Sequence, residues 1–149
     1  AFYASYFTVR ASEFEADMIQ KSPAEIYDEL QELKRKGNEA SAKEKNVYTI
    51  LELVREAKLR GIRFLPVDLY LSHPTRFLIP PEGLRPPLIA LPGLGENAAL
   101  CLDRARQEMS FCSVEDLKTR ARLSSAVIDV LKKNGCLKGL PEKNQLTLF

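Results

Sequence analysis

The sequence predicts a mainly α-helical chain in which a small β element separates a helical first half from a helical end. Capping-box patterns and helically spaced apolar residues fill roughly the first 60 of the 149 residues. Short β-type runs between prolines occupy the middle, and a glycine-containing turn followed by helical patterns occupies the last third. Hydrophobic residues make up 45% and charged residues 28%, which is typical of a globular protein with a core.

Three helices are predicted in the first half. A serine followed three positions later by glutamate, the pattern of a capping box, begins at Ser12, Ser22 and Ser41. The second helix is expected to end at Gly37. The third is expected to run from about residue 42 to residue 60, with Gly61 closing it.

The chain opens on an aromatic stretch, residues 2–7 (FYASYF). Four aromatic side chains in so short a segment are rarely left in water. We therefore expect the sequence to be part of a longer protein, another part of which covers these rings. The alternative is a helix that docks on the core of this chain.

The middle of the chain contains β-type runs at residues 62–64, 67–70 and 76–79. Proline-containing segments separate them, and a small element of two or three strands is expected. His73, the only histidine, precedes a proline here. Without a second histidine it is predicted to be a turn residue and not a metal ligand.

The most specific local pattern lies at residues 89–102 (IALPGLGENAALCL), which resembles a helix-hairpin-helix motif. Gly93 and Gly95 allow a tight turn and a close approach of another molecule. Leu94 is expected to point into the core, and the small Ala98 to let the two helices pack. The alternative is a structural glycine turn that binds no ligand.

Free N–H groups from Gly95 to Asn97 would lie at the positive end of the second helix, where an anion such as a DNA phosphate can bind. Phosphate contacts position DNA without reading its sequence. Glu96 would oppose the phosphate. The predicted DNA-binding residues are Pro92, Gly93, Leu94, Gly95, Asn97, Ala98, Arg104, Arg106, Lys118 and Arg120.

Two more helices are predicted after this hairpin. One opens at Ser113, and Ser124 caps another that runs from Ala126 to Asn134. The ordered part is expected to end at Pro141.

The last five residues, 145–149 (QLTLF), resemble the peptide with which bacterial proteins bind the sliding clamp. Leu148 and Phe149 would enter an apolar pocket, and Gln145 would form a hydrogen bond at its rim. The predicted clamp-binding residues are Gln145, Leu146, Leu148 and Phe149. The alternative is an apolar end that folds back on its own domain.

Net charge, cysteine content and the lengths of apolar runs exclude few classes of function. The formal net charge of +2 is too small to indicate nucleic-acid binding on its own. Three cysteines without a pairing pattern indicate reduced thiols in a cytoplasmic protein. No signal peptide or membrane-spanning run is recognisable, so no membrane partner is expected.

Taken together, these features resemble the C-terminal end of PolC-type bacterial DNA polymerase III. The matching segments are residues 2–10 (FYASYFTVR), 38–46 (NEASAKEKN), 67–70 (VDLY), 87–95 (PLIALPGLG), 134–137 (NGCL) and 144–149 (NQLTLF). The resemblance implies a parent DNA-directed DNA polymerase with a 3′–5′ exonuclease. Residues 1–60 would be the helical end of the fingers region, residues 61–141 a duplex-binding domain and residues 142–149 a clamp-binding tail.

Catalysis is expected to lie elsewhere in such a parent. Polymerisation requires paired carboxylates that hold Mg²⁺, and the aspartates here are scattered along the chain, at positions 17, 28, 68, 103, 116 and 129. We therefore predict no catalytic residue, metal or cofactor in this chain, with Mg²⁺ implied for the parent. The predicted partners are duplex DNA, the sliding clamp and the rest of the polymerase.

Two other functions fit the hairpin. Nucleases and glycosylases of DNA repair contain the same motif, and Asp103 lies in the stretch where such an enzyme has a catalytic residue. The third possibility is a protein-interaction module in which the hairpin only packs.

Overall fold

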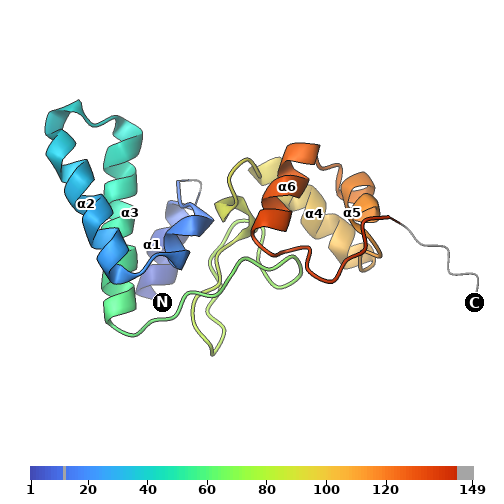
Figure 1. The fold of residues 1–149 in the computed structure, drawn as a ribbon. Coiled ribbons are helices and arrows are strands. Elements are labelled where there is room, and N and C mark those ends of the chain that lie inside the picture. Colours follow the sequence, from blue (N-terminus) through green and yellow to red (C-terminus); the bar gives the residue numbers. More distant parts are fainter. Residues whose placement is uncertain (12, 144–149) are drawn as a thin grey trace, which may run out of the picture.

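The computed structural model describes residues 1–11 and 13–143. Within them the fold is all-α, with six α-helices and three short 3₁₀ helices (Figure 1). The elements in chain order are α1 (Phe2–Val9), η1 (Ala16–Gln20), α2 (Pro23–Lys36), η2 (Gly37–Glu39), α3 (Ala42–Leu59), η3 (Leu88–Ala90), α4 (Glu96–Glu108), α5 (Val114–Ala121) and α6 (Ser125–Lys133). Over the same residues, no helix combines the length and the apolar character needed to cross a membrane.

Capping boxes start α2 and α3 as predicted. The Ser22 hydroxyl accepts from the Glu25 N–H, and the Glu25 carboxylate accepts from the Ser22 N–H, both at 3.2 Å. Ser41 and Glu44 repeat this arrangement at the start of α3. The box predicted at Ser12 lies outside the described residues, and the segment after it forms η1.

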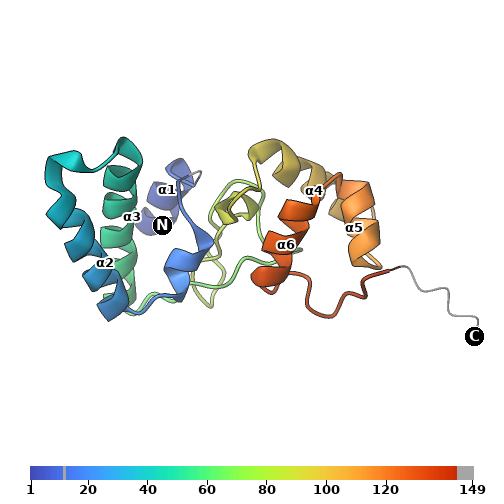
Figure 2. The ribbon, with the colours of Figure 1, turned by 45° about the horizontal axis from the view of Figure 1, so that its top comes forward.

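Helices α2 and α3 form an antiparallel pair that projects from the rest of the molecule (Figures 1 and 2). Residues 37–41 join them at the outer tip, next to an ion pair of 2.6 Å between Lys36 and Glu44. At the other end of α3, the Lys58 ammonium donates to the carbonyl oxygens of Ile19 and Lys21. These bonds hold the base of the pair against η1.

Helix α1 packs on the core of this chain through one of its faces. Tyr3 and Phe7 are buried, whereas Phe2 remains 65% exposed. The Phe7 ring lies 5.4 Å from both Phe14 and Phe77, and those two rings lie 4.9 Å apart. For Tyr3 and Phe7, the structure therefore agrees with the alternative prediction, a helix that docks on the core of this chain.

The expected strands of the middle segment do not form in the described residues, so this part of the prediction is wrong. Over residues 1–11 and 13–143, only two isolated bridges occur, a parallel one between Phe64 and Leu84 and an antiparallel one between Leu78 and Arg85. Prolines at 66, 74, 80, 81, 86 and 87 explain the difference, because each removes an N–H donor and limits the length of a ladder. Residues 60–87 therefore form a long loop segment that contains these two bridges.

The His73 side chain stabilises one turn of this loop segment. Its Nδ1 accepts hydrogen bonds of 3.1 Å from the N–H groups of Thr75 and Arg76. Burial lowers the pKa of His73, and the positive charge of Arg76 lowers it further. The predicted turn residue is thus a neutral acceptor that holds two backbone donors.

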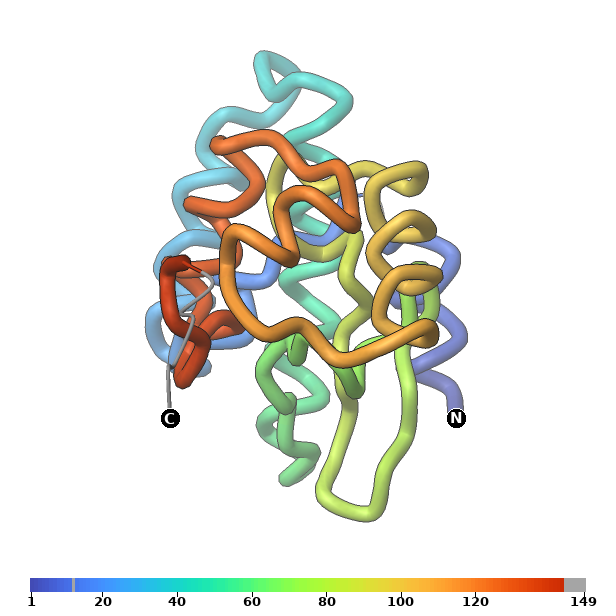
Figure 3. Tube along the Cα trace, turned by 90° about the vertical axis from the view of Figure 1, so that its right-hand side faces the viewer, coloured from blue at the N-terminus to red at the C-terminus, as the bar shows by residue number. Residues whose placement is uncertain are grey.

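Helices α4, α5 and α6 form the other end of the molecule, which faces the viewer in Figure 3. Ser113 and Ser124 cap α5 and α6 as predicted, although α6 begins at Ser125, one residue earlier than expected. After α6 the chain folds back to the start of α5. Buried residues form one core from α1 to Leu137, and the division at residue 60 stays a prediction.

Candidate nucleic-acid interface

The hairpin consists of η3, a turn at residues 91–95 and α4. Gly93 adopts a φ of 82°, a left-handed conformation that favours glycine. The Leu94 N–H donates to the Leu91 carbonyl at 3.1 Å, which closes the turn. Leu94 itself is 2% exposed, so it points into the core as expected.

Gly95 is the N-cap of α4 and leaves the start of this helix uncapped by any side chain. The first N–H groups of a helix have no acceptor within the helix. Here Gly95, Glu96 and Asn97 are all exposed, so their side of the helix end is accessible from solvent. An anion that approaches it would meet both free N–H groups and the positive end of the helix dipole.

The fold alone does not require glycine at position 95. Its φ of −75° and ψ of 174° are accessible to any residue. A Cβ atom added there would meet no heavy atom within 4 Å. The open space above Gly95 is therefore available to another molecule.

Ala99 packs at the core more closely than the predicted Ala98. Ala98 is half-buried, whereas Ala99 and Leu102 are fully buried. The small residue that allows close packing of α4 thus stands one position later than expected.

Two of the four predicted basic residues already form hydrogen bonds with other groups of this chain. Arg106 forms an ion pair of 2.6 Å with Asp103 and donates to the Leu69 carbonyl at 2.9 Å. The Arg120 guanidinium donates to the carbonyl oxygens of Ala105 and Met109. A phosphate would have to compete with these partners, and a contact of either arginine with DNA stays a prediction.

The other two basic residues are accessible. Arg104 is exposed on α4. Lys118 is exposed on α5, and its ammonium donates at 2.7 Å to the hydroxyl of Ser125, the first residue of α6. Lys118 therefore lies beside the start of a second helix.

The turn before that second helix resembles the turn of the first hairpin in three respects, which were not predicted from the sequence. Arg122 has a φ of 56°, Leu123 is 5% exposed, and Ser124 caps α6 at a φ of −74° and a ψ of 162°. These values correspond in order to those of Gly93, Leu94 and Gly95. The signal available in the sequence was the spacing of Leu123, Ile128 and Leu131, which equals that of Leu94, Ala99 and Leu102.

The two hairpins differ in the hydrogen-bond acceptors available to the N–H groups at the start of α4 and of α6. The Ser124 hydroxyl accepts from the Val127 N–H at 3.2 Å, whereas Gly95 offers no such group. The second hairpin instead contributes the exposed cations Lys118 and Arg122. Open N–H groups are thus characteristic of the first hairpin and positive side chains of the second.

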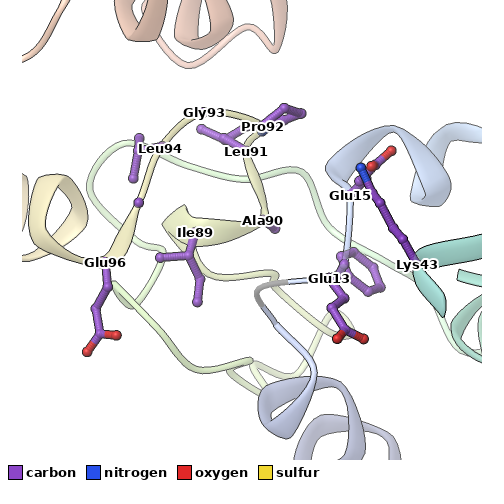
Figure 4. Close-up of a pocket in the computed structure, with 12 residues that line it drawn as sticks. Glu13, Glu15, Lys43, Ile89, Ala90, Leu91, Pro92, Gly93, Leu94 and Glu96 are labelled. Atoms are coloured by element: carbon purple, nitrogen blue, oxygen red, sulfur yellow. The ribbon is translucent and has the colours of Figure 1, made fainter. Parts of the chain in front are cut away.

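A pocket of about 470 Å³ adjoins the first hairpin (Figure 4). It is lined by residues 89–96, by Phe14 and Lys43, and by the carboxylates of Glu13 and Glu15. With Glu96 included, the lining has three glutamates and one lysine. This charge balance disfavours a phosphate inside the pocket, so the exposed outer side of the turn is the better anion site.

The predicted clamp-binding residues Gln145, Leu146, Leu148 and Phe149 lie outside the described residues. Of the three cysteines, Cys112 is exposed, and Cys101 and Cys136 are half-buried. Burial and, to a smaller extent, the nearby charge of Asp68 raise the pKa of Cys136 to about 11. Over the described ranges, no three histidine, cysteine or acidic side chains gather where they could hold a metal ion.

Comparison with known proteins agrees with the geometry of the hairpin. A family model described as "Helix-hairpin-helix motif" matches residues 61–146. The chain is 49% identical over 149 residues to DNA polymerase III PolC-type of Caldanaerobacter subterraneus, with all of the chain and 11% of that protein covered. It is 48% identical over 149 residues to the protein of the same name from Clostridium perfringens, covering 100% of the chain and 10% of the relative.

A third relative, DNA polymerase III PolC-type of Bacillus subtilis, is 46% identical over 148 residues, or 99% of the chain and 10% of that protein. The chain thus spans about a tenth of the length of the relatives it matches. The family model covers more than half of the chain, and the similarity to the polymerases extends over nearly all of it. The chain therefore belongs to the helix-hairpin-helix family and is homologous, over its whole length, to a segment of PolC-type DNA polymerase III.

Proposed function

We propose that this chain is the duplex-binding and clamp-binding portion of a bacterial replicative DNA polymerase. The observation that carries the DNA-binding part is the start of α4. Gly95 leaves exposed N–H groups without a side-chain cap, and nothing in the fold requires the missing side chain. A phosphate oxygen that approaches the backbone at this point explains both features.

The second hairpin supports the same proposal through its charges. Lys118 and Arg122 lie beside the start of α6, where they can pair with a further phosphate of the duplex. Both contacts are to the DNA backbone, so the binding is independent of base sequence. Arg104 can extend the contact along α4.

Fluorescence anisotropy with two duplexes of unrelated sequence tests the DNA-binding proposal. The Gly95→Val variant should bind both duplexes more weakly, because a β-branched side chain would occupy the space of the phosphate. Binding by the unchanged chain should fall steeply as salt is raised, as expected for phosphate contacts. Gly93→Val is expected to act in the same way but also to strain the turn, because residue 93 has a positive φ.

A matched control is Ala24→Val. Ala24 is exposed in the first turn of α2 and does not line the pocket beside the hairpin. This variant should bind DNA like the unchanged chain. Equal affinity of the Gly95→Val variant and the unchanged chain, with both folded by circular dichroism, would remove the hairpin from the DNA interface.

The polymerase assignment follows from the names and the similarity of the relatives. Under this proposal the catalytic carboxylates and their Mg²⁺, together with the 3′–5′ exonuclease, belong to other parts of a longer cytoplasmic protein. Residues 145–149 would tether that protein to the sliding clamp. The purified chain should then neither extend a primer nor degrade DNA in the presence of Mg²⁺, and nucleotide incorporation in a primer-extension assay would contradict this.

A further inference from the structure

The segment that leads to the predicted clamp-binding residues is attached to α5. The Val114 N–H donates to the Pro141 carbonyl at 2.8 Å, and the Glu115 N–H donates to the Glu142 carbonyl at 3.1 Å. Both donors belong to the first turn of α5, where the helix itself provides no acceptor. Lys132 on α6 adds an ion pair of 2.9 Å with Glu142. Contacts with two helices thus fix the point at which the chain leaves the domain.

A groove begins at this point and lies between α5 and α6. Its volume is about 450 Å³. The buried Val114 and Ile128 form its apolar floor, and the exposed Lys118 and Asp129 belong to its rim. Glu142 and Lys143 line the same groove, so the described chain leads directly along it.

The connection from this fixed point to the clamp-binding motif is short. Only residues 143 and 144 separate Glu142 from Gln145. Since a chain advances at most about 3.6 Å per residue, the Cα atom of Gln145 stays within roughly 11 Å of that of Glu142. A protein bound to residues 145–149 therefore comes close to the start of α5, at one end of the adjoining groove.

We propose that the groove between α5 and α6 is a second contact surface for the sliding clamp. This inference rests on the proposed binding of residues 145–149 to the clamp. The clamp is the occupant because the short connection brings it to this face. The domain then holds the ring in a fixed orientation and does not act as a loose tether.

Isothermal titration calorimetry with a bacterial sliding clamp compares two ligands, the 149-residue chain and a peptide of residues 141–149. The chain should bind at least about fivefold more tightly, since its groove adds a contact at high effective concentration. A chain with about twenty Gly and Ser residues inserted between Lys143 and Asn144 should lose most of this gain, because a flexible linker lowers that concentration. The insertion leaves residues 1–143 and their contacts unchanged.

Site-specific photo-crosslinking locates the contact. A photoreactive amino acid at position 129, on the rim of the groove, should crosslink to the clamp. The same amino acid at position 104, exposed on α4 and outside the groove, should not. Crosslinking at both positions or at neither would overturn the proposed surface.

The measured affinities distinguish a failure of the second contact surface from a failure of clamp binding by residues 145–149. If the peptide binds the clamp and the chain binds no more tightly, the second contact surface is disproved and clamp binding stands. If the lengthened chain keeps the full affinity of the unchanged chain, the groove has no part in binding. If neither the peptide nor the chain binds, both proposals are overturned.

Discussion

The Arg120 guanidinium on α5 donates a hydrogen bond of 2.7 Å to the backbone carbonyl of Ala105 in the last turn of α4. The same guanidinium reaches the Met109 carbonyl at 2.9 Å and lies 4.9 Å from the centre of the Phe111 ring. The Ala105 carbonyl also accepts a hydrogen bond of 3.4 Å from the Met109 N–H, so Arg120 adds a second donor at the end of α4. Arg120 joins α4 to α5 and fixes the relative placement of the two hairpins.

Arg120→Met should lower the free energy of unfolding by about 2 kcal/mol, because it removes charge-assisted hydrogen bonds to the carbonyl oxygens of Ala105 and Met109. Arg120→Lys should not restore the loss, since an ammonium lacks the planar fork that reaches both carbonyls. Urea denaturation followed by circular dichroism measures both variants. An unchanged denaturation midpoint for Arg120→Met would show that these bonds contribute nothing.

Lys118→Met should affect DNA binding and not stability. The exposed ammonium is predicted to neutralise one phosphate, so its removal should reduce the slope of log affinity against log salt by about 1. The unfolding free energy should change by less than about 0.5 kcal/mol, as is usual for surface charges. Lys34→Met, an equally exposed change on α2, is the control and should leave the salt slope unchanged. Equal slopes for both variants would remove Lys118 from the interface.

Glu96→Gln should strengthen DNA binding. The exposed Glu96 carboxylate is the first residue of α4 and stands beside the proposed phosphate, so removing its charge removes a repulsion. The helix loses a favourable charge–dipole interaction, which costs about 0.3–1 kcal/mol of stability. Glu108→Gln at the other end of α4 is the control in the same anisotropy assay. Weaker binding by Glu96→Gln would place the phosphate elsewhere.

The chain should become less stable as the pH falls below about 6.5. Burial holds the pKa of His73 in the folded chain below its usual value of 6.5, so the unfolded chain binds a proton more readily. The stabilisation by neutral His73 is complete above the unfolded-state value and is lost as pH falls through the folded-state pKa. Because His73 is the only histidine, thermal melts between about pH 7.5 and 5 isolate this effect from the carboxylates.

The variant His73→Asn checks the origin of this pH dependence. An asparagine oxygen can accept from the N–H groups of Thr75 and Arg76, as in an Asx turn, but does not titrate. Its Tm should therefore vary less with pH over the same range. An equal dependence in both proteins would assign the effect to other groups.

A peptide of residues 141–149 should bind a bacterial sliding clamp with an affinity around the micromolar range or weaker. Leu148→Ala combined with Phe149→Ala should abolish binding, because burial of each side chain contributes roughly 1.5–3 kcal/mol. Gln145→Ala should have a smaller effect, since one rim hydrogen bond contributes about 1 kcal/mol. In the full chain the double change should leave the Tm nearly unaltered. Loss of folding would instead show that these residues are part of the core.

The sequence predicted helices α2 to α6 well and the middle of the chain poorly, and the short 3₁₀ helix η1 stands where a helix from Ser12 was expected. Ser22 and Ser41 act through groups three residues away, so their capping boxes can be read locally. Strand formation depends on partners distant in the chain. The Leu84 N–H bonds to the Arg63 carbonyl, but the prolines on either side prevent this pairing from extending into a ladder.

The interface was predictable where backbone conformation follows from residue type. Gly93 and Leu94 could be placed because a left-handed turn favours glycine. Arg122 adopts the same conformation without being glycine, so the second hairpin was hidden. The partners of Arg106 and Arg120 are backbone carbonyls of other segments, and only the packed structure shows that these two cations are already engaged.

The projecting α2–α3 pair gives this molecule a convenient position for a probe. Its tip, residues 37–41, is largely exposed and lies at the opposite end of the molecule from α5 and α6 (Figure 1). Exposed tips of this kind tolerate insertions and attached groups. A fluorophore at Asn38 would move with the domain while staying clear of bound DNA and clamp, so single-molecule measurements could follow the residence of the chain on a primed template.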